Sequence, residues 1–482
     1  MINPLYLEFL TVVLGIVLLM IEAFAPHLNK KTLAFAGIAG LAVILLLSWL
    51  PVHPLAPESA AAGFYATDAL AFFFKRFMLV MTIITLLMSL EFVPAIERAL
   101  PSETPGAGVG EFFILPIFAC ASLMWLVSSI SFIMLFVSLE LMSIVLYISI
   151  SYLRKDPKSL EAGTKYLILS ALTTGFLVYG ITWVFGVTGT TSIIHLSEAI
   201  TSLPAGSLTP LLFGVALVLV AFCFKIAAFP FQFWLPDVYQ GAPTPITAFL
   251  SVASKAAGFV VLLRFLEQLY VVPVLGKKIM AATTLLAIMT LLFGNLASLA
   301  QTNMKRLLAY SSIAHAGYLL MGVASIGAAL AGPAIAFYLV AYLAMTSLAF
   351  IILIIVTEAS GGDEISRFQG LHQRSPFLAG SMVIAILSLA GLPLSAGFFG
   401  KFFIFEVALQ QHHYGLVVVG TIAVVAGFYY YLKVIRAMYW QQPVEGATFI
   451  TVSKTATVLI AVLVAAILIL GIYPTPVLMA LK

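Results

Sequence analysis

The sequence predicts an all-α polytopic membrane protein of about fourteen transmembrane helices, most of which form two inverted five-helix repeats. Hydrophobic residues make up 62% of the 482-residue chain and charged residues only 9%, whereas soluble domains carry about 25% charge. Apolar runs long enough to cross a bilayer recur along the whole chain. Two of these runs are interrupted by proline and glycine and also carry a lysine, which is typical of transporters.

The individual spans follow from a search for apolar runs of about 20 residues. Ser128 and Ser129 form a very tight turn between the fourth and the fifth span. Ala23-Phe24-Ala25 resembles a signal-peptide cleavage site, but no Lys or Arg precedes this first run, so we expect it to remain as a helix. The expected spans cover residues 5–25, 33–50, 69–91, 112–128, 130–153, 160–186, 208–236 (broken), 244–267, 279–300, 305–327, 333–357, 376–410 (broken), 415–440 and 455–473.

The two broken spans suggest an internal repeat. Pro230 interrupts the first, and the stretch LAGLPLSAGFFGKFFIF, which begins at Leu389, interrupts the second. Irregular backbone at membrane depth is tolerated only where it is buried in protein or lines a water-filled cavity. The breaks lie five spans apart, and an odd offset inverts the topology. We therefore divide the chain into residues 1–111 (helices 1–3), 112–267 (first repeat, helices 4–8), 279–440 (second repeat, helices 9–13) and 455–482 (helix 14).

The distribution of Lys and Arg predicts the orientation, because cytoplasmic loops carry an excess of both. An outward N-terminus places thirteen of them on the inner side and four on the outer side, and leaves six within spans. Both termini are then expected outside. The inner set is Lys30, Lys31, Arg98, Arg154, Lys155, Lys158, Lys305, Arg306, Arg367, Arg374, Lys433, Arg436 and Lys454; the outer set is Arg264, Lys277, Lys278 and Lys482.

Ionisable residues inside the spans are the candidate functional groups. Each lysine at membrane depth costs roughly 3 kcal/mol to insert, and a carboxylate near mid-span, such as Glu140, is too far from either end to reach water. Burial moves the pKa of such groups towards neutrality, so a chain of them wetted by water can relay protons. Histidine titrates near pH 7 and can join such a chain. The candidate relay residues are Glu140, Lys165, Lys225, Lys255, Lys401 and His315.

Each candidate also has a structural alternative. The lysines and Glu140 could form buried ion pairs whose role is only structural. Lys165 lies near the inner end of its helix and could extend to the membrane surface. His315 follows the polar run YSSIAH and could be a hydrogen-bonded core histidine.

Other polar residues are expected to have local roles. Lys75 and Arg76 lie two turns into the third span, so we expect them to extend outward or to pair with Asp68. Asp237, in the break that follows Pro230, is expected to cap the resumed helix. The cluster Tyr429-Tyr430-Tyr431 is expected to pack in the core or at the interface.

Several functions are excluded by pattern. Cys120 and Cys223 are the only cysteines, and neither belongs to a CxxC, metal-ligand or disulfide arrangement. The chain also has no dinucleotide-binding, phosphate-loop or haem-attachment motif, and no basic run for nucleic acid. We therefore expect no cofactor, metal or redox centre in this chain.

Three long motifs resemble a known family. They are KIAAFPFQFWLPDVYQGAPTPITAFLSVASK, QTNMKRLLAYSSIAHAGYLLMG and GLPLSAGFFGKFFIF, and the resemblance runs from about Asp68 to Gly471. They resemble the antiporter-like membrane subunits of respiratory complex I, the NADH:quinone oxidoreductase, and chain-wide the match is closest to the subunit N branch. A related subunit usually has a glutamate in helix twelve, where this chain has Lys401.

The resemblance implies fourteen helices in two inverted repeats, with helices seven and twelve discontinuous. It also implies proton translocation without a redox centre, driven by quinone reduction elsewhere in a translocase complex. Glu140 is similar to the helix-five glutamate that pairs with a helix-six lysine, here Lys165. The central lysine of helix seven, the connecting lysine of helix eight, a polar position of helix ten and the exit lysine of helix twelve are matched by Lys225, Lys255, His315 and Lys401.

The expected setting is a bacterial inner membrane, with neighbouring antiporter-like subunits, lipid and protons as partners. Subunits of cation/proton antiporter complexes and of membrane-bound hydrogenases share the core motifs and remain the alternative. An independent solute permease is a third possibility, but the few intramembrane polar residues are strung along successive helices, which suits protons better. A scaffold with vestigial charges is a fourth.

Overall fold

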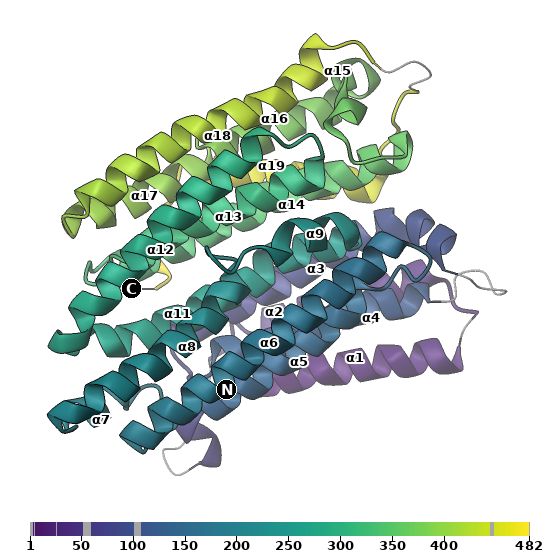
Figure 1. Cartoon of the computed structure of the whole chain (residues 1–482). Coiled ribbons are helices and arrows are strands. Elements are labelled where there is room, and N and C mark those ends of the chain that lie inside the picture. The colour runs from purple at the N-terminus through teal and green to yellow at the C-terminus, as the bar shows by residue number, and fades with distance from the viewer. Residues whose placement is uncertain are drawn as a thin grey trace.

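The chain folds as one bundle of roughly parallel helices (Figure 1). This computed structural model describes residues 3, 5–25, 27–51, 59–100, 108–443 and 448–481. Lys482, assigned above to the outer side, lies outside these residues. Within them, eleven helices are long and apolar enough to cross a membrane. The predicted all-α, multi-pass character is therefore confirmed.

The helices match the apolar runs closely, with a few longer ends. The predicted span 69–91, for example, continues to Ala99 in α3. The longer elements are α1 (Tyr6–Phe24), α2 (Lys30–Leu47), α3 (Ala69–Ala99), α4 (Val109–Val127), α5 (Phe132–Ile150), α6 (Pro157–Thr188), α8 (Leu208–Ile226), α9 (Trp234–Gly241), α11 (Lys255–Tyr270), α12 (Pro273–Leu299), α13 (Met304–Val323), α14 (Ala331–Ser360), α16 (Pro376–Ala390), α17 (Ala396–Gln410), α18 (Tyr414–Trp440) and α19 (Lys454–Leu470). The short ones are η1 (Ala60–Gly63), α7 (Leu196–Thr201), η2 (Ala205–Ser207), α10 (Thr244–Phe249), η3 (Leu250–Ser254), η4 (Ile365–Phe368), α15 (Leu371–Arg374) and α20 (Thr475–Met479).

Side chains in the connections determine where several helices begin. Asp156 accepts a hydrogen bond from the backbone N–H of Lys158, and Pro157 occupies the first position of α6, where no N–H is needed. Asn303 caps α13 in the same way through the N–H of Arg306. These caps satisfy backbone groups that the first helical turn leaves unpaired.

The backbone departs from regular helix at three places near the buried lysines. Helix α8 ends at Ala227, which has the left-handed φ of 57°, and the chain becomes helical again at α9. The expected span 244–267 contains the π-helical segment η3 immediately before Lys255. Helix α16 ends at Gly391, with φ 93°, and α17 begins five residues later. Such irregularities are common at functional sites.

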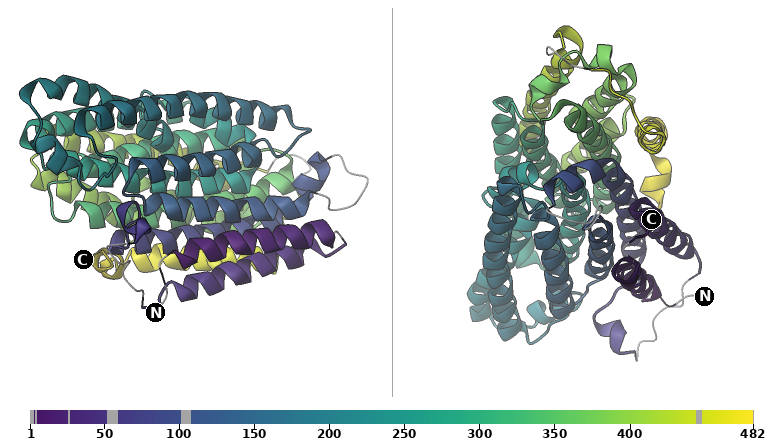
Figure 2. Two further views of the ribbon diagram at one scale, coloured as in Figure 1. Left: turned by 90° about the horizontal axis from the view of Figure 1, so that it is seen from below. Right: turned by 90° about the vertical axis from the view of Figure 1, so that its right-hand side faces the viewer.

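The two halves of the chain occupy different sides of the bundle (Figure 1). Helices α1 to α11 form one side and α12 to α18 the other, while α19 packs against both α14 and α3. Every residue from 244 to 266, in α10, η3 and α11, is buried, and α14 is buried along most of its length, so these helices form the centre. Helix α1 begins and α20 ends at the same end of the bundle (Figure 2).

Lys75 lies elsewhere than the sequence predicted. Its side chain is 0% exposed, and its ammonium lies 3.1 Å from the carboxylate of Glu8 in α1. It also donates a hydrogen bond to the hydroxyl of Tyr65, which in turn donates to Glu8 at 2.7 Å. The expected partner, Asp68, instead forms two hydrogen bonds of 2.7 Å with Arg264 of α11. Lys75 therefore joins α3 to α1. Its side chain does not extend to the surface as expected, because neighbouring helices bury it completely.

Arg76 is only partly buried, and it contacts the end of α2 rather than Asp68. Its guanidinium donates to the carbonyl oxygen of Ser48 at 2.7 Å and lies 3.9 Å from the ring centroid of Trp49. These contacts bind the start of α3 to the end of α2.

The Glu8–Lys75 pair leads to a stability prediction. Lys75→Met should lower the free energy of unfolding by about 3–5 kcal/mol, because it leaves the Glu8 carboxylate buried and uncompensated. The double variant Glu8→Met/Lys75→Met should recover most of this loss. The measurement is thermal unfolding of the purified protein in detergent, with the exposed Lys278→Met as control. A double variant as unstable as the single one would contradict the prediction.

Candidate proton relay

Lys225 is buried at the end of a broken helix. It lies in the last turn of α8 and is 6% exposed. Its ammonium donates to the hydroxyls of Ser143 in α5 and Ser170 in α6, each at 2.8 Å. The carbonyl end of a helix also favours a positive charge. The site thus holds a cation with neutral partners alone.

The expected pair of Glu140 and Lys165 does not form. Glu140 accepts a hydrogen bond of 2.5 Å from Thr174 and acts electrostatically on Lys225. Lys165 instead contacts Asp237 and Glu161, each at 2.7 Å. Because the Lys165 side chain is 41% exposed, its ammonium remains in contact with solvent while it pairs with the two carboxylates. Pairing with Glu140 would require its desolvation, which is unfavourable.

Asp237 has a different role from the predicted one. It lies in the first turn of α9, and its two carboxylate oxygens bind Lys165 at 2.7 Å and Arg306 at 2.8 Å. The residue before α10 is Pro243, so Asp237 does not cap the resumed helix. Burial alone would raise the pKa of Asp237, but its hydrogen bonds with Lys165 and Arg306 lower it. Asp237 therefore joins α6 to α13 in a partly exposed charge cluster.

Lys255 is held by Ser312, which sequence reasoning missed. The ammonium donates to the carbonyl oxygen of Ser312 at 2.6 Å and also to its hydroxyl. The same hydroxyl accepts from Tyr342 at 2.9 Å and lies 3.2 Å from the hydroxyl of Tyr239. Ser312 therefore connects α11, α13, α14 and α9. The polar run that begins at Tyr310, at membrane depth, was the available signal.

His315 continues this network one turn further along α13. Its Nδ1 lies 2.7 Å from the hydroxyl of Tyr338, and its Nε2 lies 3.3 Å from the hydroxyl of Tyr431. Tyr431 also hydrogen-bonds to Ser311. Tyr431 was expected only to pack, so this assignment is corrected: its ring packs in the core and its hydroxyl belongs to the network.

Lys401 lies at the second helix break, between α16 and α17. Its ammonium donates to the carbonyl oxygens of Leu389 at 3.0 Å and Ala390 at 2.7 Å, in the last turn of α16. These carbonyls have no partner within their helix, because the helix stops there. A Cβ on Gly391 would lie 2.9 Å from the Lys401 side chain, so the break needs glycine for space as well as for its φ.

These groups form a line across the middle of the bundle. A Cβ added to Gly258, one turn after Lys255, would lie 3.9 Å from Cβ of Lys225, and His315 lies within electrostatic range of both Lys255 and Lys401. Ser and Tyr hydroxyls accompany Lys225, Lys255 and His315, and a hydroxyl can both donate and accept a hydrogen bond. No three His, Cys, Asp or Glu side chains gather as metal ligands in the part of the chain that the structure describes.

Helices broken at membrane depth, with buried lysines beside each break, define the class: this is an antiporter-like transport protein of the membrane. The particular family follows from comparison with known proteins. The sequence model of the NADH:quinone oxidoreductase/Mrp antiporter transmembrane family matches residues 129–427. The chain belongs to this family.

Its relatives match over nearly the whole length. NADH-quinone oxidoreductase subunit N of Moorella thermoacetica is 38% identical in sequence, and the match covers 97% of this chain and 95% of the relative. The subunit N of Trichlorobacter lovleyi is 37% identical, and the match covers 99% of this chain and 95% of the relative. A chain of respiratory complex I from Thermus thermophilus superposes with a TM-score of 0.79 at 30% identity, covering 99% of both chains. A chain of an archaeal membrane-bound sulfane sulfur reductase shares the fold, with a TM-score of 0.84 at 23% identity.

The Asp237 ion pairs predict a pH effect. Since the folded-state pKa of Asp237 is lowered, its stabilisation is complete above the ordinary value of 3.8 and is lost as pH falls through the folded value. Asp237→Asn should therefore lower the melting temperature at pH 6, and the gap to the wild type should close in strong acid. Thermal unfolding in detergent between pH 3 and 7 measures this.

The matched control is Glu198→Gln, which removes an exposed partner of His195 and should change little at any pH. A gap between wild type and Asp237→Asn that stays constant across this range would contradict the assignment.

Proposed function

We propose that this chain is the proton-translocating, antiporter-like membrane subunit, of the subunit N type, of an NADH:quinone oxidoreductase. One observation carries the proposal. Lys225, Lys255 and Lys401 are 2–7% exposed, yet among the described residues none has a carboxylate within ion-pair distance. A structural ion pair would keep an ammonium permanently charged. Hydroxyl and carbonyl partners instead leave the amine free to gain and lose a proton.

The proposed topology has fourteen spans. Helices α8 and α9 form the broken seventh span, and α16 with α17 the broken twelfth. The short lengths of α16 and α17 support this, because 15 residues each extend only about 22 Å, less than the roughly 30 Å of a bilayer core. Spans four to eight and nine to thirteen are the inverted repeats, which correspond to residues 112–267 and 279–440.

In the proposed mechanism, Lys225 is the central proton carrier. The negative charge of Glu140 favours a protonated Lys225, and Lys165 modulates this effect by moving between Asp237 and Glu140. A proton leaving Lys225 passes to Lys255, which connects the two halves through Ser312. His315 and its tyrosine partners extend the path, and Lys401 releases the proton outward or passes the charge to a neighbouring subunit.

The proposed setting is a bacterial inner membrane, with both termini on the outer side and neighbouring antiporter-like subunits as partners. The chain itself carries no redox centre, so electron transfer to quinone takes place elsewhere in the complex. The second candidate is a subunit of a cation/proton antiporter complex. It rests on the family description and on the fold shared with a chain of the Mrp complex from Dietzia, with a TM-score of 0.82 at 19% identity.

Lys225→Ala tests the proposal. With the complex assembled, we expect proton pumping driven by quinone reduction to fall several-fold, because the central carrier is absent. The measurement is acidification by inside-out membrane vesicles during NADH oxidation, with assembly verified on the same sample. Lys278→Ala, at an exposed lysine, is the control. An assembled Lys225→Ala variant that pumps and turns over normally would make Lys225 structural and favour the scaffold alternative.

A further inference from the structure

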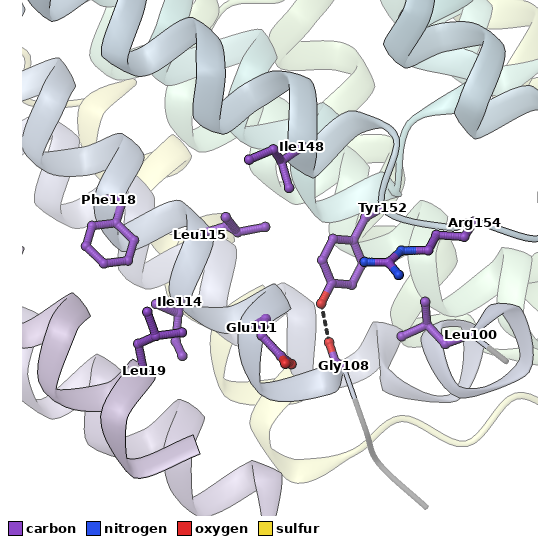
Figure 3. A pocket seen from close by; sticks show the side chains of 10 residues that line it. All are labelled: Leu19, Leu100, Gly108, Glu111, Ile114, Leu115, Phe118, Ile148, Tyr152 and Arg154. Atoms are coloured by element: carbon purple, nitrogen blue, oxygen red, sulfur yellow. Dashed lines mark hydrogen bonds between the residues drawn. The ribbon is translucent and has the colours of Figure 1, made fainter. Parts of the chain in front are cut away.

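A second site lies away from the relay, between α1, α4 and α5 (Figure 3). It is a pocket of about 510 Å³, within the roughly 300–1,000 Å³ typical of small-molecule sites. Its deeper end is apolar, lined by Leu19, Ile114, Leu115, Phe118 and Ile148. The relay uses none of these residues.

The wall from α4 explains the shape of the pocket. Glu111, Ile114, Leu115 and Phe118 follow the i, i+3, i+4, i+7 spacing of one helix face. From Glu111 to Phe118 this face runs about 10 Å along the helix axis. Polar and apolar parts are therefore stacked along the direction in which the helices cross the membrane, as they are in a lipid molecule.

The other end of the pocket is polar. Figure 3 shows Glu111, Tyr152 and Arg154 there, with Tyr152 donating a hydrogen bond to the carbonyl oxygen of Gly108. Glu111 begins α4 and Arg154 follows α5, so this is the end that the Lys and Arg distribution assigns to the inner membrane surface.

Two opposite charges at this end are available to a ligand. Oε2 of Glu111 is buried without a hydrogen bond, and the exposed Arg154 has no ion pair or hydrogen bond with any described residue. The nearby Glu22 is already paired with Lys30 at 2.5 Å. A carboxylate oxygen that is buried without a donor is unfavourable, so a hydrogen-bond donor beside Glu111 would be stabilising, and the exposed Arg154 is accessible to an anion.

We propose that this pocket binds one phospholipid with a zwitterionic phosphoethanolamine headgroup. Arg154 binds the phosphate, Glu111 accepts hydrogen bonds from the ammonium, and one acyl chain follows the face of α4 to Phe118. Guanidinium groups bind phosphate in a bidentate fork. A purely anionic headgroup would pair with Arg154 but would offer no cation to Glu111, whose negative charge would repel it. The bound lipid joins α1 to α5, the helix that carries Glu140.

The test is photo-crosslinking in membranes that carry the full-length protein. The probe is phosphatidylethanolamine with a diazirine on one acyl chain, and labelled peptides are located by mass spectrometry. We expect labelling of the α4 peptide around Phe118 and of α5 around Ile148. Arg154→Gln and the pocket-filling Leu115→Trp should each reduce this labelling at least threefold. Arg436→Gln, an exposed arginine far along the chain, should leave it unchanged.

A second probe tests the headgroup. The same diazirine on phosphatidylglycerol, which is anionic and lacks the ammonium, should label wild type less, and Glu111→Gln should narrow the difference between the two lipids. Equal labelling by both lipids in wild type would overturn the headgroup assignment. Labelling that neither Arg154→Gln nor Leu115→Trp reduces would mean an adventitious acyl chain only. An absence of labelled α4 and α5 peptides in wild type would mean that the lipid does not occupy the pocket and would overturn the proposal. None of these outcomes depends on whether the chain translocates protons.

Discussion

The need to supply hydrogen-bond acceptors to buried lysine ammonium groups that have no carboxylate beside them is the constraint on which the centre of this protein depends. Lys225, Lys255 and Lys401 each meet this need with backbone or hydroxyl oxygens. Lys401 takes the two carbonyls that α16 leaves unpaired where it ends. Lys225 lies where α8 ends and takes two serine hydroxyls, and Lys255 follows a π-helical turn and takes both oxygens of Ser312. The unpaired carbonyl groups at a helix break thus take the place of the water molecules that the bilayer core does not provide.

The same structure separates two kinds of buried charge. Lys75 is paired with a carboxylate and lies among the first three long helices, and Arg264 is paired with Asp68. These pairs are fixed, because each partner would be left uncompensated without the other. The lysines near the helix breaks have only neutral partners. This difference allows a group to change its protonation state without leaving an opposite charge stranded.

A partly exposed charge cluster is formed by Lys165, Asp237 and Arg306. Lys165 lies there rather than beside Glu140, so Glu140 has a neutral hydrogen-bond partner and acts on Lys225 without a direct counter-charge. The pocket between α1, α4 and α5 is lined in part by Ile148 of α5, the helix that carries Glu140.

The sequence by itself determined the membrane class, most of the apolar helices, both helix breaks and the burial of Lys225, Lys255 and Lys401. These are local properties: hydropathy sums over neighbouring residues, and Pro and Gly act on their own backbone. The sequence did not determine which side chains pair with one another. Lys165 meets Asp237 across 72 positions, and Arg264 meets Asp68 across 196. Lys75 is buried only because α1 returns beside α3 with Glu8 at the matching height. Ser312 and Tyr431 look like ordinary core residues until helix packing brings Lys255 and His315 against them. Only the tertiary structure decides these pairings, because each depends on the relative rotation and depth of two helices, which no single helix specifies.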